Sequence, residues 1–381
     1  RPGATSSPRP KRRPPEEPER IRAGRLEATH APAKVTLMRS AKKQAAQSVI
    51  NPCSSATMQK NQPPPAMTDI LTVTMNPALD VSTATDKVSD THKLRCAGAH
   101  FHPGGGGINV ARVLHRLGAD CLALYPAGGM NGQRLQKLLD QEAVRSHCIA
   151  IAEETRESFS VLETSSGRDF RFVLPGPELS PAESEACLAF LREAMALDSP
   201  PRYLIVSGSL PPGVPVDFYA RLARLARTHG SRLVLDTSGP ALAAALAEGV
   251  YLLKPSLREL RELTGQPLAT ELEWREAAQQ IIRAGQAQVV ALSLGEEGAL
   301  LVTADRALRA RSVPVTVKSS IGAGDSFVGG LVWALKRNLE LDSAFRYGMA
   351  AGAAALLTPG TALCQAADVE RLHSQVTVIC A

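Results

Sequence analysis

From Ile70 onward, short runs of apolar and β-branched residues alternate with longer stretches in which apolar residues recur at positions i, i+3 and i+4. The short runs predict buried strands, and the longer stretches predict amphipathic helices. Such an alternation is typical of an α/β fold with a mainly parallel central sheet, which binds ligands beyond the carboxyl ends of its strands. Strands are expected at residues 70–75, 121–125, 203–206, 232–236, 251–253 and 289–292, and a helix at 216–228.

Two regions break this alternation. Residues 81–101 and 148–174 contain strand-like runs without helices between them, such as Phe159–Glu163 and Asp169–Val173. Strands that follow one another directly pair most readily with each other. We therefore expect a small separate β-sheet that acts as a lid over the main domain.

Residues 1–66 have a different composition from the rest of the chain. They hold 11 of the 27 prolines and 13 Lys and Arg against 4 Glu, without a hydrophobic period. This composition predicts a disordered, basic, Pro-rich extension. The chain starts at Arg1, and Met38, Met58 and Met67 are alternative starts, so this extension is either native or an over-extended reading frame. Its Arg content also suggests a targeting peptide, but the four Glu argue against that interpretation. The single folded domain is expected at residues 67–381.

Charge and cysteine content narrow the class of protein. Outside the extension, 43 − 13 = 30 basic residues face 37 − 4 = 33 acidic ones, so the net charge of +6 belongs to the extension and a nucleic-acid partner is not predicted. The longest apolar runs are too short to cross a membrane. The seven cysteines lack C-x-x-C spacing, which argues against a zinc site or a disulfide framework and fits a cytoplasmic protein.

A glycine turn comes directly before one predicted helix. The segment Pro103-Gly-Gly-Gly-Gly-Ile-Asn-Val-Ala-Arg-Val-Leu-His-Arg-Leu-Gly118 places four glycines ahead of an amphipathic pattern. Glycines allow backbone conformations closed to other residues and let a ligand approach the main chain. A bound ligand and an ordinary flexible turn are both consistent with this segment. A dinucleotide fingerprint fits less well, because its strand, its glycine spacing and its acidic residue are not in order here.

A second glycine-rich segment, Ser319-Ser-Ile-Gly-Ala-Gly-Asp-Ser-Phe-Val-Gly-Gly330, opens the helix expected at residues 327–336. The amide groups of Gly322, Ala323 and Gly324 would converge there on an anion hole, where the helix dipole favours negative charge. Asp325 would lie beside a bound phosphoryl group and accept the proton of an attacking hydroxyl. The alternative is that Asp325 only caps the helix.

Taken together, the two segments resemble the signatures of the ribokinase-like (PfkB-type) carbohydrate kinases, and the similarity extends over residues 68–375. The chain is similar in particular to the minor bacterial 6-phosphofructokinase branch. Further matching segments are Asn76–Asp80, Lys93–Cys96, Thr155-Arg156, Arg171–Gly176, Ser207–Gly213, Lys254-Pro255 and Gly360–Cys364.

The resemblance implies a Rossmann-like α/β domain, a small β-sheet lid that also forms a homodimer interface, and ATP with Mg²⁺. It implies by position that Asp80, Asn109 and the turn Gly104, Gly105, Gly106 and Gly107 bind sugar hydroxyls. It implies that Lys93, Arg156 and Ser209, assisted by Arg95, hold the substrate phosphate, that Lys254 lies near the nucleotide phosphates, and that Ser293, Gly295 and Gly298 line the nucleotide pocket. Without the surrounding motifs, Lys93, Arg95 and Arg156 would be read as ordinary solvated charges.

The implied reaction is the ATP-dependent phosphorylation of fructose 6-phosphate to fructose 1,6-bisphosphate. The 1-phosphofructokinase and tagatose-6-phosphate kinase branches usually carry a lysine inside the glycine turn, whereas this chain has Gly105-Gly-Gly107, which favours fructose 6-phosphate. Those two activities remain alternatives, as does a non-catalytic sugar-phosphate sensor. The family often has Asn-x-x-Glu after Lys-Pro, but here the segment is Ser256-Leu-Arg-Glu259, so only Glu259 is expected to help place Mg²⁺, through water.

Overall fold

The computed structural model describes residues 68–381, so the predictions for the N-terminal extension lie outside the described residues. The strands are β1 (Ile70–Val73), β2 (Ala78–Thr85), β3 (His100–Gly104), β4 (Leu122–Ala127), β5 (Ser146–Ala150), β6 (Arg156–Glu163), β7 (Arg168–Val173), β8 (Tyr203–Ser207), β9 (Arg232–Asp236), β10 (Val250–Leu253), β11 (Ala287–Ser293), β12 (Ala299–Val302), β13 (Ala307–Ala310) and β14 (Val378–Cys380). The helices are α1 (Gly106–Arg116), α2 (Gly129–Gln141), α3 (Pro181–Met195), α4 (Phe218–Thr228), α5 (Gly239–Leu246), α6 (Leu257–Thr264), α7 (Glu271–Arg283), α8 (Ala323–Lys336), α9 (Leu341–Ala355) and α10 (Ala366–His373), with a short 3₁₀ turn η1 (Gly295–Glu297).

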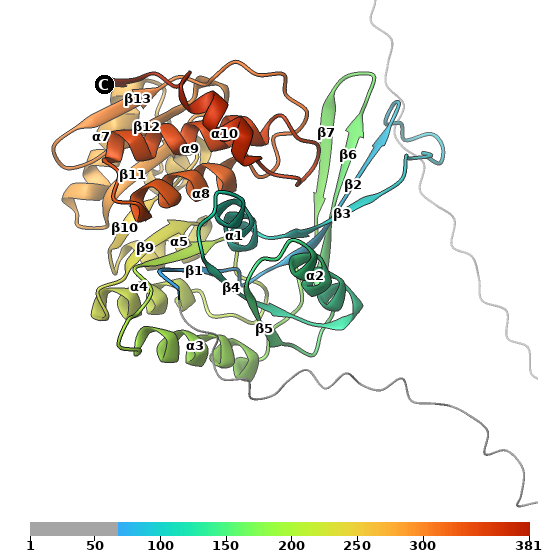
Figure 1. Ribbon diagram of the computed structural model, residues 1–381, viewed down its shortest axis with the longest axis horizontal. Coiled ribbons are helices and arrows are strands. Elements are labelled where there is room, and N and C mark those ends of the chain that lie inside the picture. The colour runs from blue at the N-terminus through green and yellow to red at the C-terminus, as the bar shows by residue number, and fades with distance from the viewer. Residues whose placement is uncertain (1–67) are drawn as a thin grey trace, which may run out of the picture. The chain divides into compact units, whose positions relative to one another are not determined.

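A ten-stranded sheet forms the centre of the fold, in the order β14-β13-β12-β11-β10-β9-β8-β1-β4-β5 (Figure 1). Neighbouring strands from β5 to β11 in that order run parallel. The remaining strands, β12 to β14, extend the sheet in antiparallel fashion. The expected α/β class with a mainly parallel sheet is therefore confirmed, and each of the six expected strands is present.

Both faces of this sheet are buried, because successive side chains of a strand point to opposite faces. In β8, for example, Ile205 belongs to one core with residues of α1, α8 and α9, while Leu204 and Val206 belong to a second core with residues of α3, α4 and α7. Burial on both faces explains why these strands read as continuous apolar runs.

The expected small sheet is also present, in the order β3-β2-β6-β7 (Figure 1). It occupies less of the chain than the sequence suggested, since residues 148–150 belong to β5 at the edge of the large sheet. One face carries Asp80, which pairs with Ser158 in the register of β2 and β6. The opposite face carries Val81 and its register neighbour Phe159. Polar and apolar residues thus alternate, so that one face of the small sheet is polar.

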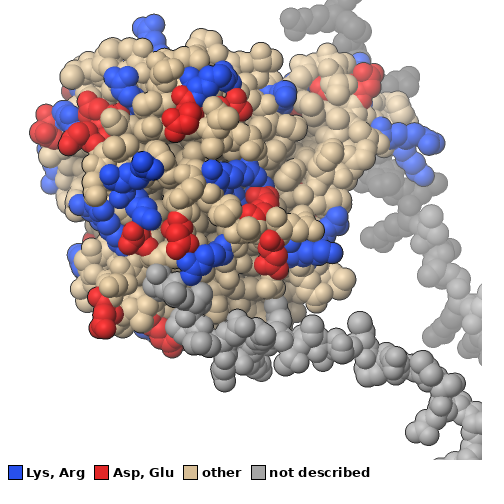
Figure 2. All heavy atoms as spheres, in the orientation of Figure 1, with Lys and Arg blue, Asp and Glu red and all other residues tan. Residues whose placement is uncertain are grey.

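Basic and acidic side chains are interspersed over the face of the molecule in Figure 2. This mixture agrees with the nearly balanced charges counted for residues 67–381. Among the described residues, none of the helices has both the length and the apolar character needed to span a bilayer.

Candidate active site

The glycine turn between β3 and α1 is held against the carboxyl ends of β1 and β8. Gly105 has φ 112° and precedes the first residue of α1. A Cβ at Gly106 would lie 2.1 Å from Ser207 Oγ, and a Cβ at Gly107 would lie 2.5 Å from the carbonyl oxygen of Val73. Close approach to neighbouring strands, and not flexibility, therefore requires glycine here.

The second glycine segment begins α8, and the helix starts at Ala323, four residues earlier than expected. Gly322 has φ 76° at the N-cap position, and no side chain caps this helix end. Asp325 lies in the first turn and accepts a hydrogen bond from Asn109 Nδ2 at 2.9 Å. The geometry therefore speaks against the helix-cap interpretation, because Asp325 contacts the glycine-turn helix.

Asp325 has an unusual protonation equilibrium. Its pKa is raised from 3.8 to about 6, first by burial and next by the nearby Asp236 carboxylate. The hydrogen bond from Asn109 and the positive charges of Lys254 and Arg171 oppose it. A carboxylate whose pKa approaches neutrality is well matched to accept a proton from a hydroxyl group.

A cavity between the two sheets gathers many of the predicted residues. Its walls come from the small sheet, the glycine turn, the ends of β8 and β9, and the starts of α6 and α8. The residues that line it are Ala78, Asp80, Gly105, Gly106, Asn109, Arg156, Ser158, Arg171, Val173, Ser207, Gly208, Ser209, Asp236, Thr237, Ser238, Glu259 and Asp325. A second cavity shares Asp325 and Arg171 and adds Gly322 and Gly324, so the two meet at the proposed base.

The amides of the predicted anion hole are not all equivalent. Gly322 and Gly324 line the second cavity, whereas Ala323 does not, and its N–H donates to the carbonyl oxygen of Ser320 at 3.4 Å. Gly324 also lies close to Lys254, since a Cβ built there would lie 3.6 Å from Lys254 Nζ. A phosphoryl group at the start of α8 would therefore face two backbone amides, the helix dipole and a lysine.

Asp80 lines the cavity beside the glycine turn. It is buried, and burial raises its pKa, while a hydrogen bond from the Thr361 side chain and the charges of Arg171, Arg112 and Arg156 oppose that rise. Its carboxylate sits directly on the glycine turn, because a Cβ at Gly104 would lie 2.3 Å from Asp80 Cγ. A buried carboxylate can accept further hydrogen bonds beside the one from Thr361, which suits a sugar hydroxyl.

Two arginines line the cavity, and they differ in their partners. The guanidinium of Arg156 donates to the carbonyl oxygens of Leu174 at 2.7 Å and Asn76 at 2.9 Å. The guanidinium of Arg171 makes no hydrogen bond to another residue of the described part of the chain. Arg171 was not among the predicted site residues. The sequence did contain a signal for it, since Arg171 falls in a strand-like alternating run and in one of the segments matched to the family.

The structure does not bring every predicted phosphate ligand to the cavity. Ser209 lines it, and its hydroxyl accepts from Asn76 Nδ2 at 3.3 Å. Lys93 and Arg95 are exposed on the segment between β2 and β3 and line neither cavity. Within one chain, the geometry therefore supports Arg156 and Ser209 as phosphate ligands and gives no such support to Lys93 or Arg95.

On the nucleotide side, Lys254 at the end of β10 is buried and forms an ion pair with Asp236 at 3.0 Å. Burial alone would lower the pKa of Lys254, but Asp236, Glu259 and Asp325 together raise it, so the ammonium group stays charged. Asp236 was missed because a single acidic residue at the end of a predicted strand carries no motif. The remaining predicted nucleotide residues line neither cavity: Ser293 is the last residue of β11, and Gly295 and Gly298 follow that strand.

The replacement of asparagine by Ser256 has a local explanation. Ser256 and Glu259 form a capping box at the start of α6, in which Ser256 Oγ accepts from Glu259 N and Glu259 Oε2 accepts from Ser256 N at 2.8 Å. Serine and asparagine are both strong N-cap residues, so the helix start is preserved. Glu259 still lines the cavity with Asp236.

These two carboxylates bear on a metal site. Among the described residues, no group of three or more His, Cys, Asp or Glu side chains is placed to hold an ion by protein ligands alone. Mg²⁺ usually keeps several waters and binds through one or two carboxylates together with substrate phosphates. Asp236 and Glu259 in the wall of the cavity fit this mode of binding.

Comparison with known proteins gave consistent matches. A family model described as "pfkB family carbohydrate kinase" matches residues 67–368. The chain is 50% identical over 302 residues to the ATP-dependent 6-phosphofructokinase isozyme 2 of Mycobacterium tuberculosis, covering 79% of this chain and 88% of that protein. It is 36% identical over 269 residues to the 1-phosphofructokinase of Xanthomonas campestris, covering 70% and 83%. The crystal structure of Escherichia coli phosphofructokinase-2 with fructose-6-phosphate superimposes with a TM-score of 0.75 at 38% identity, covering 81% and 99%.

Proposed function

This chain belongs to the PfkB family of carbohydrate kinases, and on that premise we propose that it transfers the γ-phosphoryl group of ATP to the 1-hydroxyl of fructose 6-phosphate. The products would be ADP and fructose 1,6-bisphosphate. The observation that carries this proposal is the position of Asp325, which lies where a cavity with sugar-binding and cationic residues meets the glycine-rich start of α8.

The chain's own residues account for the steps of an in-line transfer. Asp325 accepts the proton of the attacking hydroxyl while the bond from that oxygen to the γ-phosphorus forms and the bond to the β,γ-bridging oxygen breaks. The amides of Gly322 and Gly324 and the cations Arg171 and Lys254 stabilise the charge on the moving phosphoryl group. Mg²⁺ would be held by Asp236 and Glu259, in part through water, and would supply positive charge beside the ATP phosphates.

Substrate choice rests on the cations of the cavity. Arg156 and Ser209 line it and would hold the phosphate already present on the sugar, while Asp80 and Asn109 would bind hydroxyl groups. The glycine turn contains no lysine that would hold a phosphate at the other end of the sugar. This arrangement favours fructose 6-phosphate over fructose 1-phosphate and agrees with the name of the relative at 50% identity.

A coupled assay of ADP release, run with the full chain and ATP, tests this function. The panel of acceptors is fructose 6-phosphate, fructose 1-phosphate, tagatose 6-phosphate and free hexoses. We expect fructose 6-phosphate to give the highest kcat/KM. A higher kcat/KM for fructose 1-phosphate or tagatose 6-phosphate would identify that sugar phosphate as the substrate instead. Binding of fructose 6-phosphate without turnover of any acceptor would favour a sugar-phosphate sensor.

We also propose that the enzyme, in the cytoplasm where ATP and sugar phosphates are found, forms a homodimer through the small sheet. Phe159 and Phe172 are direct neighbours in the register of β6 and β7, on the face opposite to Asp80. Their side chains are 38% and 56% exposed, and a second copy of the same sheet would bury them.

Phe172→Glu is expected to convert this dimer to a monomer, because it places a charge in the centre of an apolar interface. Sedimentation velocity measures the mass directly. Val216→Glu is the matched control, since Val216 is 53% exposed and lies before α4, outside the small sheet. A wild-type protein of monomeric mass, or a Phe172→Glu dimer, would contradict the proposed interface.

A further inference from the structure

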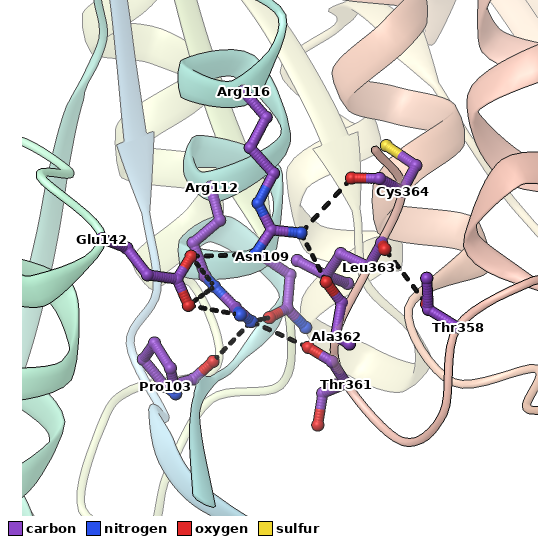
Figure 3. Close-up of polar contacts among 10 residues, drawn as sticks. All are labelled: Pro103, Asn109, Arg112, Arg116, Glu142, Thr358, Thr361, Ala362, Leu363 and Cys364. Carbon is purple, nitrogen blue, oxygen red and sulfur yellow. Dashed lines mark hydrogen bonds and ion pairs between the residues drawn. The ribbon is translucent and has the colours of Figure 1, made fainter. Parts of the chain in front are cut away.

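A buried arginine on α1, Arg112, connects the hydrogen-bonded residues Asn109 and Asp325 to the loop of residues 358–364. The Arg112 side chain is completely buried, and its charge is balanced by Glu142, which accepts from Arg112 Nη2 at 2.6 Å and from Nε at 3.0 Å (Figure 3). The other terminal nitrogen, Nη1, donates to the carbonyl oxygens of Pro103 and Thr361, each at 3.0 Å. The partners of Arg112 are thus protein groups, and its side chain does not line the cavity.

The same nitrogen of Arg112 also reaches the site itself. Nη1 donates to Asn109 Oδ1 at 3.4 Å, while Asn109 Nδ2 donates to Asp325 Oδ2 at 2.9 Å. A guanidinium group has only donors and a carboxylate has only acceptors. With the Asn109 amide turned the other way, its NH₂ group would face Arg112 and its oxygen would face Asp325, so both contacts would become repulsive. Arg112 and Asp325 therefore select the same orientation of the amide.

The loop that Arg112 holds also contacts both ends of the site. Thr361, whose carbonyl oxygen accepts from Arg112, hydrogen-bonds through its side chain to Asp80. Leu363 of the same loop lies against the start of α8, because a Cβ at Gly322 would lie 2.3 Å from Leu363 Cδ2. The buried guanidinium of Arg112 thus contacts both the carbonyl oxygen of Thr361, whose side chain hydrogen-bonds to Asp80, and the side-chain amide of Asn109, which donates to Asp325.

We infer that Arg112 is a positioning residue, which fixes the Asn109 amide so that its NH₂ group holds the Asp325 carboxylate in place for proton transfer. This inference rests on the proposed function for the role of Asp325. The charged groups that act on Asp325 are Asp236 at the end of β9, Lys254 at the end of β10 and Arg171 on β7. Arg112 adds to these through Asn109, since the hydrogen bond from Asn109 lowers the pKa of Asp325.

Arg116 provides a matched control on the same helix. It donates to Glu142 Oε2 at 3.0 Å and to the carbonyl oxygens of Ala362 and Cys364, so it shares the ion pair and the loop with Arg112 (Figure 3). It makes no hydrogen bond to Asn109 within the described residues. A purely structural role of the cluster would therefore affect variants of both arginines alike.

The test compares Arg112→Lys with Arg116→Lys. Lysine keeps the charge beside Glu142, but its single nitrogen cannot also reach Pro103, Thr361 and Asn109. We expect Arg112→Lys to lower kcat by roughly tenfold with little change in KM for ATP, because small misplacements of a catalytic group have effects of this size. The acidic limb of the pH profile of kcat should also move to higher pH, by about one pH unit. Arg116→Lys should keep the wild-type profile.

A second readout does not need a substrate. In protein labelled with ¹³C-aspartate, the carboxyl signal of Asp325 is identified by its absence in Asp325→Asn. Its titration midpoint should rise in Arg112→Lys and stay unchanged in Arg116→Lys. The variant Arg112→Met leaves Glu142 paired with Arg116 and should show the same rise. Wild-type titration in both Arg112 variants, or an equal rise in Arg116→Lys, would overturn the inference. An altered titration in an enzyme inactive on every sugar phosphate would refute the proposed function and the role in proton transfer, while the orientation of the Asn109 amide by Arg112 would stand.

Discussion

Asp325→Asn is expected to lower kcat by ~10² to 10⁴, the usual contribution of a general base, while KM for fructose 6-phosphate changes little. The reason is geometric, since asparagine has nearly the same shape but cannot accept the proton of the attacking hydroxyl. Steady-state assays with ATP and fructose 6-phosphate measure both constants. In the wild type, turnover should fall as the pH is lowered through about 6, where Asp325 becomes protonated.

The stability of the same variant separates loss of a base from loss of the fold. The folded-state pKa of Asp325 is raised from 3.8 to about 6, so its contribution to stability is fully present below 3.8 and is lost as the pH rises through about 6. A neutral asparagine should therefore leave Tm at neutral pH unchanged or higher. Asp217→Asn, at an exposed helix start without a side-chain cap, is the control and should keep full activity. A near-normal kcat in Asp325→Asn would show that Asp325 is not the general base.

The fold was predictable because each strand of the parallel sheet carries its own signal. Burial on both faces makes β1, β8 and β11 continuous apolar runs, and such runs are visible in the sequence. The antiparallel extension was not anticipated as a unit, since β12 and β13 are four residues each and separated by a short turn. The family and kinase predictions are confirmed by the match over residues 67–368.

The site was only partly predictable, because its residues come from segments far apart in the chain. Asp325 and Asn109 carry motif signals and are in contact across 216 positions. Asp236, by contrast, is placed by the pairing of β8, β9 and β10, and only that pairing brings it to Lys254. The phosphate role assigned to Lys93 and Arg95 came from position along the chain, and the segment between β2 and β3 keeps both away from the cavity of their own chain.

Arg171 is the clearest case of a residue revealed by the sheet register. It pairs with Ser160 across β6 and β7, and Ser160 pairs with Ser82, two positions from Asp80 on the same face. This register turns the guanidinium toward the cavity, where its charge lowers the pKa of both Asp80 and Asp325. Arg171 also lines the second cavity, together with Gly322 and Gly324. Arg171 therefore stands between the proposed sugar site and the proposed site of the moving phosphoryl group.

Arg171→Met is accordingly expected to lower kcat by roughly 10² to 10³, within reach of the effect of arginines that stabilise phosphoryl transfer. The assay belongs at about pH 8, above the pKa of Asp325 of about 6, so that the loss of a neighbouring positive charge does not protonate the base. Arg171→Lys should restore only part of the activity, because an ammonium group cannot bind two phosphoryl oxygens as a planar guanidinium does. Arg192→Met on α3, which removes only an exposed pair with Glu185, should retain wild-type kcat. A higher KM for fructose 6-phosphate with unchanged kcat would instead assign Arg171 to ground-state binding of the sugar phosphate, because an interaction made equally in the ground state and the transition state does not alter kcat.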